Sequence, residues 1–239
     1  MHSEIISKII PNMEDQFKKI FFTFDLDWCS DIVLDYMLKI LESYDVHATF
    51  FVTHPTLLLN RIRENPKFEL GIHPNFNFLL AGDSRYGKTY KEVIDYFIAM
   101  VPEAKSVRSH SLTQSSGILN AFSEAGLTHE CNLYLPPHIL PKPHLHWNGK
   151  LIRVPHFFQD DIECINGWIN LSVIRRMVEL NCIKVFDIHP IHVFLNTENI
   201  KRYIDSTSIV NDHLKLTQLT NNKIFGTKDL LLELLDQSI

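Results

Sequence analysis

The chain has 239 residues, of which 45% are hydrophobic and 21% charged, and its formal net charge is −5. This composition allows a sizeable core, and the acidic balance without a long Lys/Arg run argues against a nucleic-acid surface. The four cysteines form no CxxC pair, no apolar run approaches the roughly 20 residues of a membrane helix, and no signal-peptide pattern opens the chain. We therefore expect one soluble, cytoplasmic domain over residues 1–239, with no transmembrane segment and no nucleic-acid partner.

The first informative stretch is an apolar strand at Phe21–Phe24, which is followed by two carboxylates, Asp25 and Asp27. Side chains two positions apart on a strand point the same way, so both acids are expected on one side of its C-terminal end. One interpretation is a general base beside a metal ligand, because two close acids need a cation or a proton between them. The other interpretation is an acid that caps the next helix and an acid that is simply solvated.

Strand and helix patterns then alternate along the chain. Further strands are predicted at 46–53, 67–72, 105–108, 127–133, 150–154 and 183–187. Helices are predicted at 30–44, 55–63, 88–100, 114–125, 169–180, 197–205 and 227–236, with a Gly- and Asn-rich loop at 76–87 and a polar stretch at 206–222. This alternation predicts βαβ units and a parallel sheet in an α/β domain.

Polar and ionisable side chains recur where the predicted strands end. They are Asp25, Asp27, His54, His73, Arg108, His110, Asp160, His189 and His192. A single histidine at a strand end is more often a hydrogen-bonded structural residue than a ligand. Several acids and histidines at consecutive strand ends need partners, however, and a metal or a polar substrate provides them. Because the ends of parallel barrel strands converge on one face, we expect a functional site there.

With these residues in place, the chain resembles the NodB-type polysaccharide deacetylases, or carbohydrate esterase family 4, over roughly residues 20–195. Phe24–Trp28 resembles the family's Thr-Phe-Asp-Asp motif with a spacer between the acids, and Ala48–Val52 resembles its Ala-Thr-Phe-Phe strand. Ile188–His192 resembles the final motif, which supplies the catalytic histidine. The likeness is greatest to divergent bacterial members from surface-polysaccharide gene clusters. It implies a distorted or incomplete (β/α) barrel with seven or eight parallel strands.

The resemblance also implies a metal site. One divalent ion, with zinc expected and cobalt or nickel as alternatives, would be held by Asp27, His73 and the residue at position 77. The family has a second histidine where this chain has Asn77, and a neutral amide is a poorer zinc ligand than imidazole. His110 is a spare imidazole that could replace the missing ligand.

Catalytic roles are implied in the same way. Asp25 would act as the general base and His189 as the general acid. Substrate-binding or orienting roles would fall to Arg108, His110, Asp160, Asp161 and His192. Alternatively, Arg108 could form a plain surface ion pair.

The function implied is a metal-dependent deacetylase that removes an N-acetyl group from a sugar in surface-polysaccharide biosynthesis. Its substrate would be a sugar or a lipid- or nucleotide-linked saccharide. One alternative is a sugar-binding or assembly protein that has lost turnover, which Asn77 favours and the retained Asp25 and His189 disfavour. Another is a different metal-dependent amidase, because the loops that contact the acceptor vary between relatives. The sequence leaves the sugar and the oligomeric state open.

Overall fold

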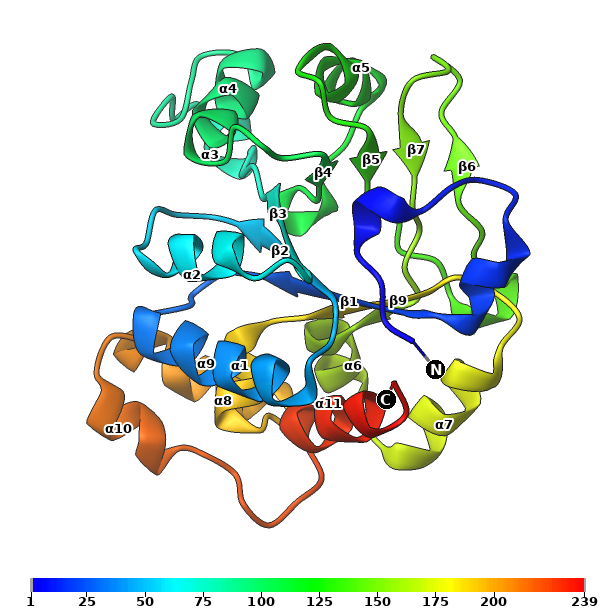
Figure 1. Cartoon of the computed structure of the whole chain (residues 1–239). Helices are drawn as coiled ribbons and strands as arrows, with labels where there is room; N and C mark the ends of the chain where they lie inside the picture. The colour runs from blue at the N-terminus through cyan, green and yellow to red at the C-terminus, as the bar shows by residue number, and fades with distance from the viewer. Residues whose placement is uncertain (1, 239) are drawn as a thin grey trace.

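The computed structural model describes residues 2–238 and shows a strongly curled sheet with helices around it (Figure 1). Within these residues the sheet has nine strands in the order β6-β7-β5-β4-β3-β2-β1-β9-β8. Every neighbouring pair is parallel except β6 and β7, which are antiparallel. The α/β class and the eight parallel strands are therefore confirmed, with one antiparallel strand added at an edge of the half-barrel.

The sheet is built from a few long central strands and several short ones. The strands are β1 (Ile20–Asp25), β2 (Ala48–Val52), β3 (Phe68–Ile72), β4 (Ser106–Val107), β5 (His129–Glu130), β6 (His144–Leu145), β7 (Ile152–Arg153), β8 (Phe158–Gln159) and β9 (Lys184–Ile188). The four longest strands lie side by side as β3-β2-β1-β9, so they form a rigid centre for the sheet.

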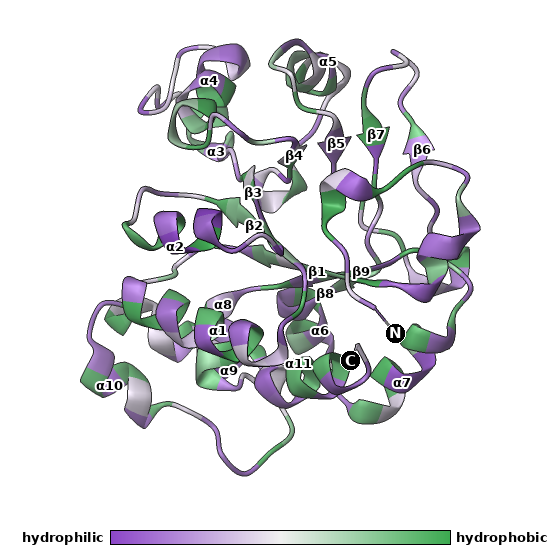
Figure 2. Cartoon of the chain, viewed as in Figure 1, coloured by the Kyte–Doolittle hydropathy of each residue, from purple (hydrophilic) through white to green (hydrophobic). Residues whose placement is uncertain are grey.

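The helices cover the outside of this sheet. They are α1 (Asp31–Tyr44), α2 (Leu58–Glu64), α3 (Asn77–Leu80), α4 (Tyr90–Met100), α5 (Ser116–Glu124), α6 (Asp160–Asn166), α7 (Leu171–Glu179), α8 (Pro190–Leu195), α9 (Ile200–Ser206), α10 (His213–Gln218) and α11 (Thr227–Asp236). Figure 2 shows hydrophobic and hydrophilic residues alternating around helices such as α1, as expected for helices with one buried side. None of the helices within residues 2–238 has the length and apolarity needed to span a bilayer.

Four short helices were not predicted from the sequence. They are α3, which lies in the expected loop at 76–87, and α6, α8 and α10. Each has only four to seven residues. Apolar periodicity needs a longer window to distinguish a helix from a loop, so segments of this length give little signal.

Alternate residues of β1 face two different cores. Phe22 and Phe24 pack in the outer core, between sheet and helices, whereas Phe21 packs in an inner core inside the curled sheet. Asp25 is four positions after Phe21 and therefore lies on the inner face. The inner face is thus apolar where β1 begins and polar where it ends.

The N-terminal segment fills the other end of the inner core. Ile6, Ile9 and Phe17 pack there against residues of the strands. The backbone N–H of Ile6 donates to Thr49 Oγ1 at the start of β2 (3.0 Å), and Nε2 of His129 at the start of β5 lies 2.9 Å from the carbonyl oxygen of Ile9. This segment therefore covers the amino ends of the strands and leaves their carboxyl ends for the site.

Candidate active site

The carboxyl ends of the central strands open into one cleft of about 120 Å³. Six of the residues singled out in the sequence line it: Asp25, Asp27, His73, His110, Asp161 and His189. Asp25 is the last residue of β1, while Asp27 lies in the turn that follows, so the strand does not extend to the second acid. Both carboxylates nevertheless reach the same cleft.

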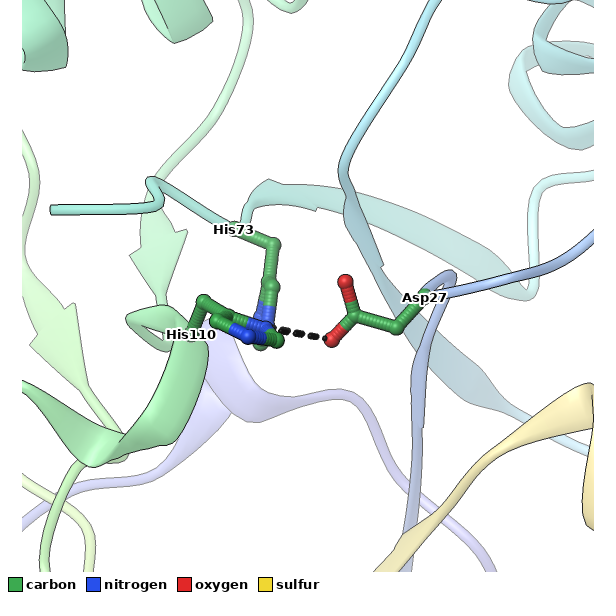
Figure 3. A group of neighbouring side chains, drawn as sticks. All are labelled: Asp27, His73 and His110. Atoms are coloured by element: carbon green, nitrogen blue, oxygen red, sulfur yellow. Dashed lines mark hydrogen bonds and ion pairs between the residues drawn. The ribbon is translucent and has the colours of Figure 1, made fainter. Parts of the chain in front are cut away.

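Asp27, His73 and His110 form a close cluster (Figure 3). Oδ2 of Asp27 lies 3.0 Å from Nε2 of His73 and 2.9 Å from Nδ1 of His110. The two imidazole rings are nearly perpendicular, with centroids 5.6 Å apart. One carboxylate oxygen and two ring nitrogens are therefore directed at the same small volume.

The electrostatics of this cluster favour a cation. Burial alone raises the pKa of the Asp27 carboxyl, but the imidazoles of His73 and His110 outweigh burial and hold that pKa well below its ordinary value. Burial lowers the pKa of His73, but the Asp25 and Asp27 carboxylates outweigh burial and raise it. An ionised carboxylate between two imidazoles is a donor set that suits zinc.

His73 provides the direct test of whether a metal fits. Its side chain is buried, yet within residues 2–238 neither ring nitrogen has a partner with hydrogen-bond geometry. Buried polar atoms are normally paired, and a bound cation would pair one of these two nitrogens. The residues present therefore fit a divalent metal ion.

Asn77 lies away from this cluster, at the start of the short helix α3. Its side chain is exposed, its Nδ2 donates to Ser111 Oγ (3.0 Å), and its Oδ1 accepts from Thr113 Oγ1 (3.4 Å). The structure thus places His110, rather than Asn77, beside Asp27 and His73.

Arg108 is completely buried beneath the cleft, so the alternative of a surface ion pair is wrong. Its Nη1 donates to Asp25 Oδ1 (2.9 Å) and to Asp187 Oδ1 (2.7 Å). Its Nη2 donates to Thr23 Oγ1 (2.9 Å), and its Nε donates to the Cys131 carbonyl (3.3 Å). Arg108 therefore fixes one oxygen of Asp25 in place.

Asp187 is a site residue that the sequence analysis missed. It lies on β9 two positions before His189, and that spacing was the available signal, because it puts the side chain on the inner face. Burial raises the pKa of the Asp187 carboxyl well above its ordinary value, against the opposing effect of Arg108. Two carboxylates thus share one guanidinium in a fully buried group.

His189 and Asp160 form a second pair in the site. Nδ1 of His189 lies 2.7 Å from Asp160 Oδ1, and the His189 backbone N–H donates to Asp160 Oδ2 (2.8 Å). Burial alone lowers the pKa of His189, but the Asp160 carboxylate outweighs burial and raises it well above its ordinary value. The pair therefore favours a protonated imidazole at the edge of the cleft.

The remaining two predicted residues have different surroundings. Asp161 lines the cleft directly beside Asp160. His192 is buried on α8 instead, with its ring centroid 5.7 Å from that of His189 and 4.8 Å from that of Tyr203. Burial lowers the pKa of His192, so this residue supports His189 as a neutral ring.

The curled α/β half-barrel has acids at the end of its first strand, a histidine after the third strand and an Asp–His pair at the same cleft. This is the arrangement expected of a polysaccharide deacetylase. A family model of WbmS-like polysaccharide deacetylases matches residues 22–207, and the chain belongs to this family. The family resemblance found in the sequence is therefore confirmed.

Two solved structures are similar to this chain. It is 40% identical to a Bordetella bronchiseptica protein assigned as a polysaccharide deacetylase involved in O-antigen biosynthesis, with a TM-score of 0.92 over 99% of this chain and 98% of that one. It is 15% identical to a Mycobacterium smegmatis protein assigned as a polysaccharide deacetylase, with a TM-score of 0.50 over 92% and 89% of the chains, which shows a shared fold alone. A comparison with curated proteins gives no match.

Proposed function

We propose that this protein is a metal-dependent deacetylase that hydrolyses the N-acetyl group of a sugar destined for a bacterial surface polysaccharide. Membership of the WbmS-like family and the 40% identity to a protein assigned to O-antigen biosynthesis support this proposal. The observation that carries it is that three groups needed for amide hydrolysis share one cleft. They are the Asp27–His73–His110 cluster, the carboxylate of Asp25 and the imidazole of His189.

The metal would be held by Asp27, His73 and His110, with His110 in the position expected for Asn77. When bound, such an ion polarises the acetyl carbonyl and lowers the pKa of a water molecule. The same oxygen and nitrogen donors favour zinc over a hard cation such as magnesium.

Asp25 would take the proton from the attacking water. Arg108 occupies its Oδ1, whereas Oδ2 lies 3.6 Å from Nδ1 of His73 and faces the cluster. A base must be oriented before it can accept a proton efficiently, and Arg108 supplies that orientation. Water adds to the carbonyl carbon as its proton passes to Asp25.

His189 would donate a proton to the leaving nitrogen. The Asp160 carboxylate engages Nδ1 and leaves Nε2 for the substrate, while its charge keeps the ring protonated. Transfer of this proton to nitrogen accompanies cleavage of the C–N bond. The products are acetate and a free amino sugar.

Acetate release from methyl glycosides, nucleotide-linked forms and polymers of N-acetylated sugars tests the proposal. We expect zinc-loaded protein to release acetate, and Asp25→Asn or His189→Gln to lower kcat by about a hundredfold or more while metal still binds. Asp95→Asn and His138→Gln, at exposed positions, are matched controls that should keep full activity.

Two results would contradict the proposal and favour its alternatives. Saccharide binding without acetate release from any of these compounds would indicate a sugar-binding or assembly protein. Acetate release from simple acetamides but from no sugar would indicate another amidase.

A further inference from the structure

Trp28 stands at the rim of the cleft and has no part in the chemistry proposed above. It directly follows Asp27, lines the cleft and is 48% exposed. All three tryptophans of the chain are exposed, and Trp28 is the one that lines the cleft, so its place beside the reactive cluster rather than its exposure calls for an explanation.

The backbone at this rim is held in an unfavourable conformation. Trp28 has a φ of 49°, in the left-handed region that residues with a Cβ rarely adopt. Among residues 2–238, the other non-glycine residues with such a φ, apart from Asn and Asp, are Ser111, Leu112 and Leu140. Ser111 and Leu112 line the same cleft. Strained backbone of this kind persists where the surroundings impose it and gathers at ligand-binding sites.

Two aromatic contacts fix the plane of the Trp28 ring. Its centroid lies 5.8 Å from that of His110 at 68° and 5.5 Å from that of Tyr203 at 63°. Tyr203 is itself packed on the buried His192, with centroids 4.8 Å apart. These contacts hold the ring while 48% of the residue stays exposed, so a ligand can stack on it at little cost in side-chain entropy.

We propose that Trp28 is a stacking platform for an uncharged pyranose ring, which it holds with the acetamido group directed at the Asp27–His73–His110 cluster. The identity of the ligand as the substrate sugar rests on the proposed function. A pyranose has an apolar C–H face that suits an indole and polar edges that suit Ser111, Gln159 and Asp161 of the cleft lining.

The charge of the cleft explains why the ring should be uncharged. Among the described residues that line it are three carboxylates, of Asp25, Asp27 and Asp161, and no lysine or arginine. A carboxylate or phosphate on the bound ring would therefore meet three acidic side chains with no lysine or arginine among the described lining residues to pair with, and the imidazole of His189 already pairs with Asp160. We therefore expect any phosphate of a carrier to lie outside this cleft.

Fluorine NMR of the full chain labelled with 5-fluorotryptophan tests the platform directly. The chain has three tryptophans, and Trp147 and Trp168, which are 74% and 53% exposed and do not line the cleft, are internal controls. The probes are methyl β-glucopyranoside and methyl N-acetyl-β-glucosaminide. We expect both to shift the Trp28 resonance saturably and to leave the other two in place.

Substitutions then separate stacking from mere support of His110. We expect Trp28→Leu to weaken binding of both probes about tenfold, Trp28→Phe to weaken it less, and Trp147→Leu to leave it unchanged. Zinc affinity should be the same in all three variants. Unchanged probe binding with reduced zinc affinity in Trp28→Leu would show that Trp28 only supports His110, and the proposal would be wrong.

Different results would contradict the proposed stacking platform and the proposed deacetylase function. A Trp28 resonance that neither probe moves would overturn the platform, whether or not acetate is released. A saturable shift with methyl β-glucopyranoside, which has no acetyl group, would support the platform even if no acetate is released from any sugar.

Discussion

At the scale of single residues, the sharpest question is which side chain completes the proposed metal site. His110 Nδ1 is 2.9 Å from Asp27 Oδ2, whereas the Asn77 side chain is bonded to Ser111 and Thr113. We expect His110→Ala to weaken zinc binding more than about a hundredfold, because it removes a ligand outright, and Asn77→Ala to change it less than about threefold. Calorimetric titration of metal-free protein measures both affinities.

His73→Ala serves as the positive control in that experiment, because His73 belongs to the cluster under either assignment. A large loss of affinity in Asn77→Ala with none in His110→Ala would restore Asn77 as the ligand. Loss in neither variant would place the metal elsewhere and remove the basis for the roles of Asp25 and His189.

The sequence could place most site residues but not the Asn77 side chain, for a geometric reason. Asp25, His73 and His189 each stand at or directly after the end of a long, apolar strand, and such strands are recognisable from sequence. Residues four apart share a face when both lie in one helix or one strand, but 73–76 belong to neither and α3 begins only at Asn77. The His-to-Asn spacing therefore did not bring the two side chains together.

At the scale of elements, the sequence predicted the long strands and the helices α1 and α11 well because each shows a full period of apolar residues. Strands were also predicted where β4, β5 and β7 lie, but those strands have only two residues each. The two-residue strands β6 and β8 were not predicted, because they are defined by pairing with neighbours rather than by their own residues. The position of Asp160 depends on β8, because Asp160 is the first residue of α6 and directly follows that strand. Its contact with His189 was therefore not predictable from local sequence.

The helix α6 also carries Glu163, which should make stability depend on pH. Glu163 is buried, its Oε2 has no partner within residues 2–238, and its Oε1 accepts from the Tyr134 hydroxyl (3.3 Å). Burial raises the pKa of Glu163 from 4.5 to about 7. Between these values the unfolded chain loses this proton while the folded protein keeps it, so the free energy of unfolding should fall as pH rises.

Urea denaturation at several pH values measures this effect. We expect Glu163→Gln, which stays neutral, to lose less stability than wild type between pH 4.5 and 7. Glu103→Gln, at an exposed position, is the matched control and should follow the wild-type curve. Parallel curves for wild type and Glu163→Gln would contradict a raised pKa.

At the scale of the whole molecule, the N-terminal segment and the site occupy opposite ends of the inner core. Ile6 is fully buried in that core, whereas Ile10, four residues later, is 54% exposed. We expect Ile6→Ala to lower the free energy of unfolding by about 2–5 kcal/mol, the range for truncating a buried aliphatic side chain. Ile10→Ala should change it by less than about 0.5 kcal/mol.

Chemical denaturation measures both stabilities, and a zinc titration shows whether the site is affected. Because Ile6 contacts the amino ends of the strands, zinc affinity should be unchanged in Ile6→Ala under conditions where it remains folded. Equal stabilities for the two variants would mean that the segment does not contribute to the core.

Arg108 limits which substitutions this chain can accept beneath the cleft. One guanidinium joins β1, β9 and the carbonyl after β5, and it also orients Asp25, so the fold and the proposed chemistry involve the same atoms. Removing one partner from such a buried charged group leaves the others uncompensated. We therefore expect substitutions at the rim, around Trp28 and Leu112, to be tolerated better than substitutions of the buried residues around Arg108.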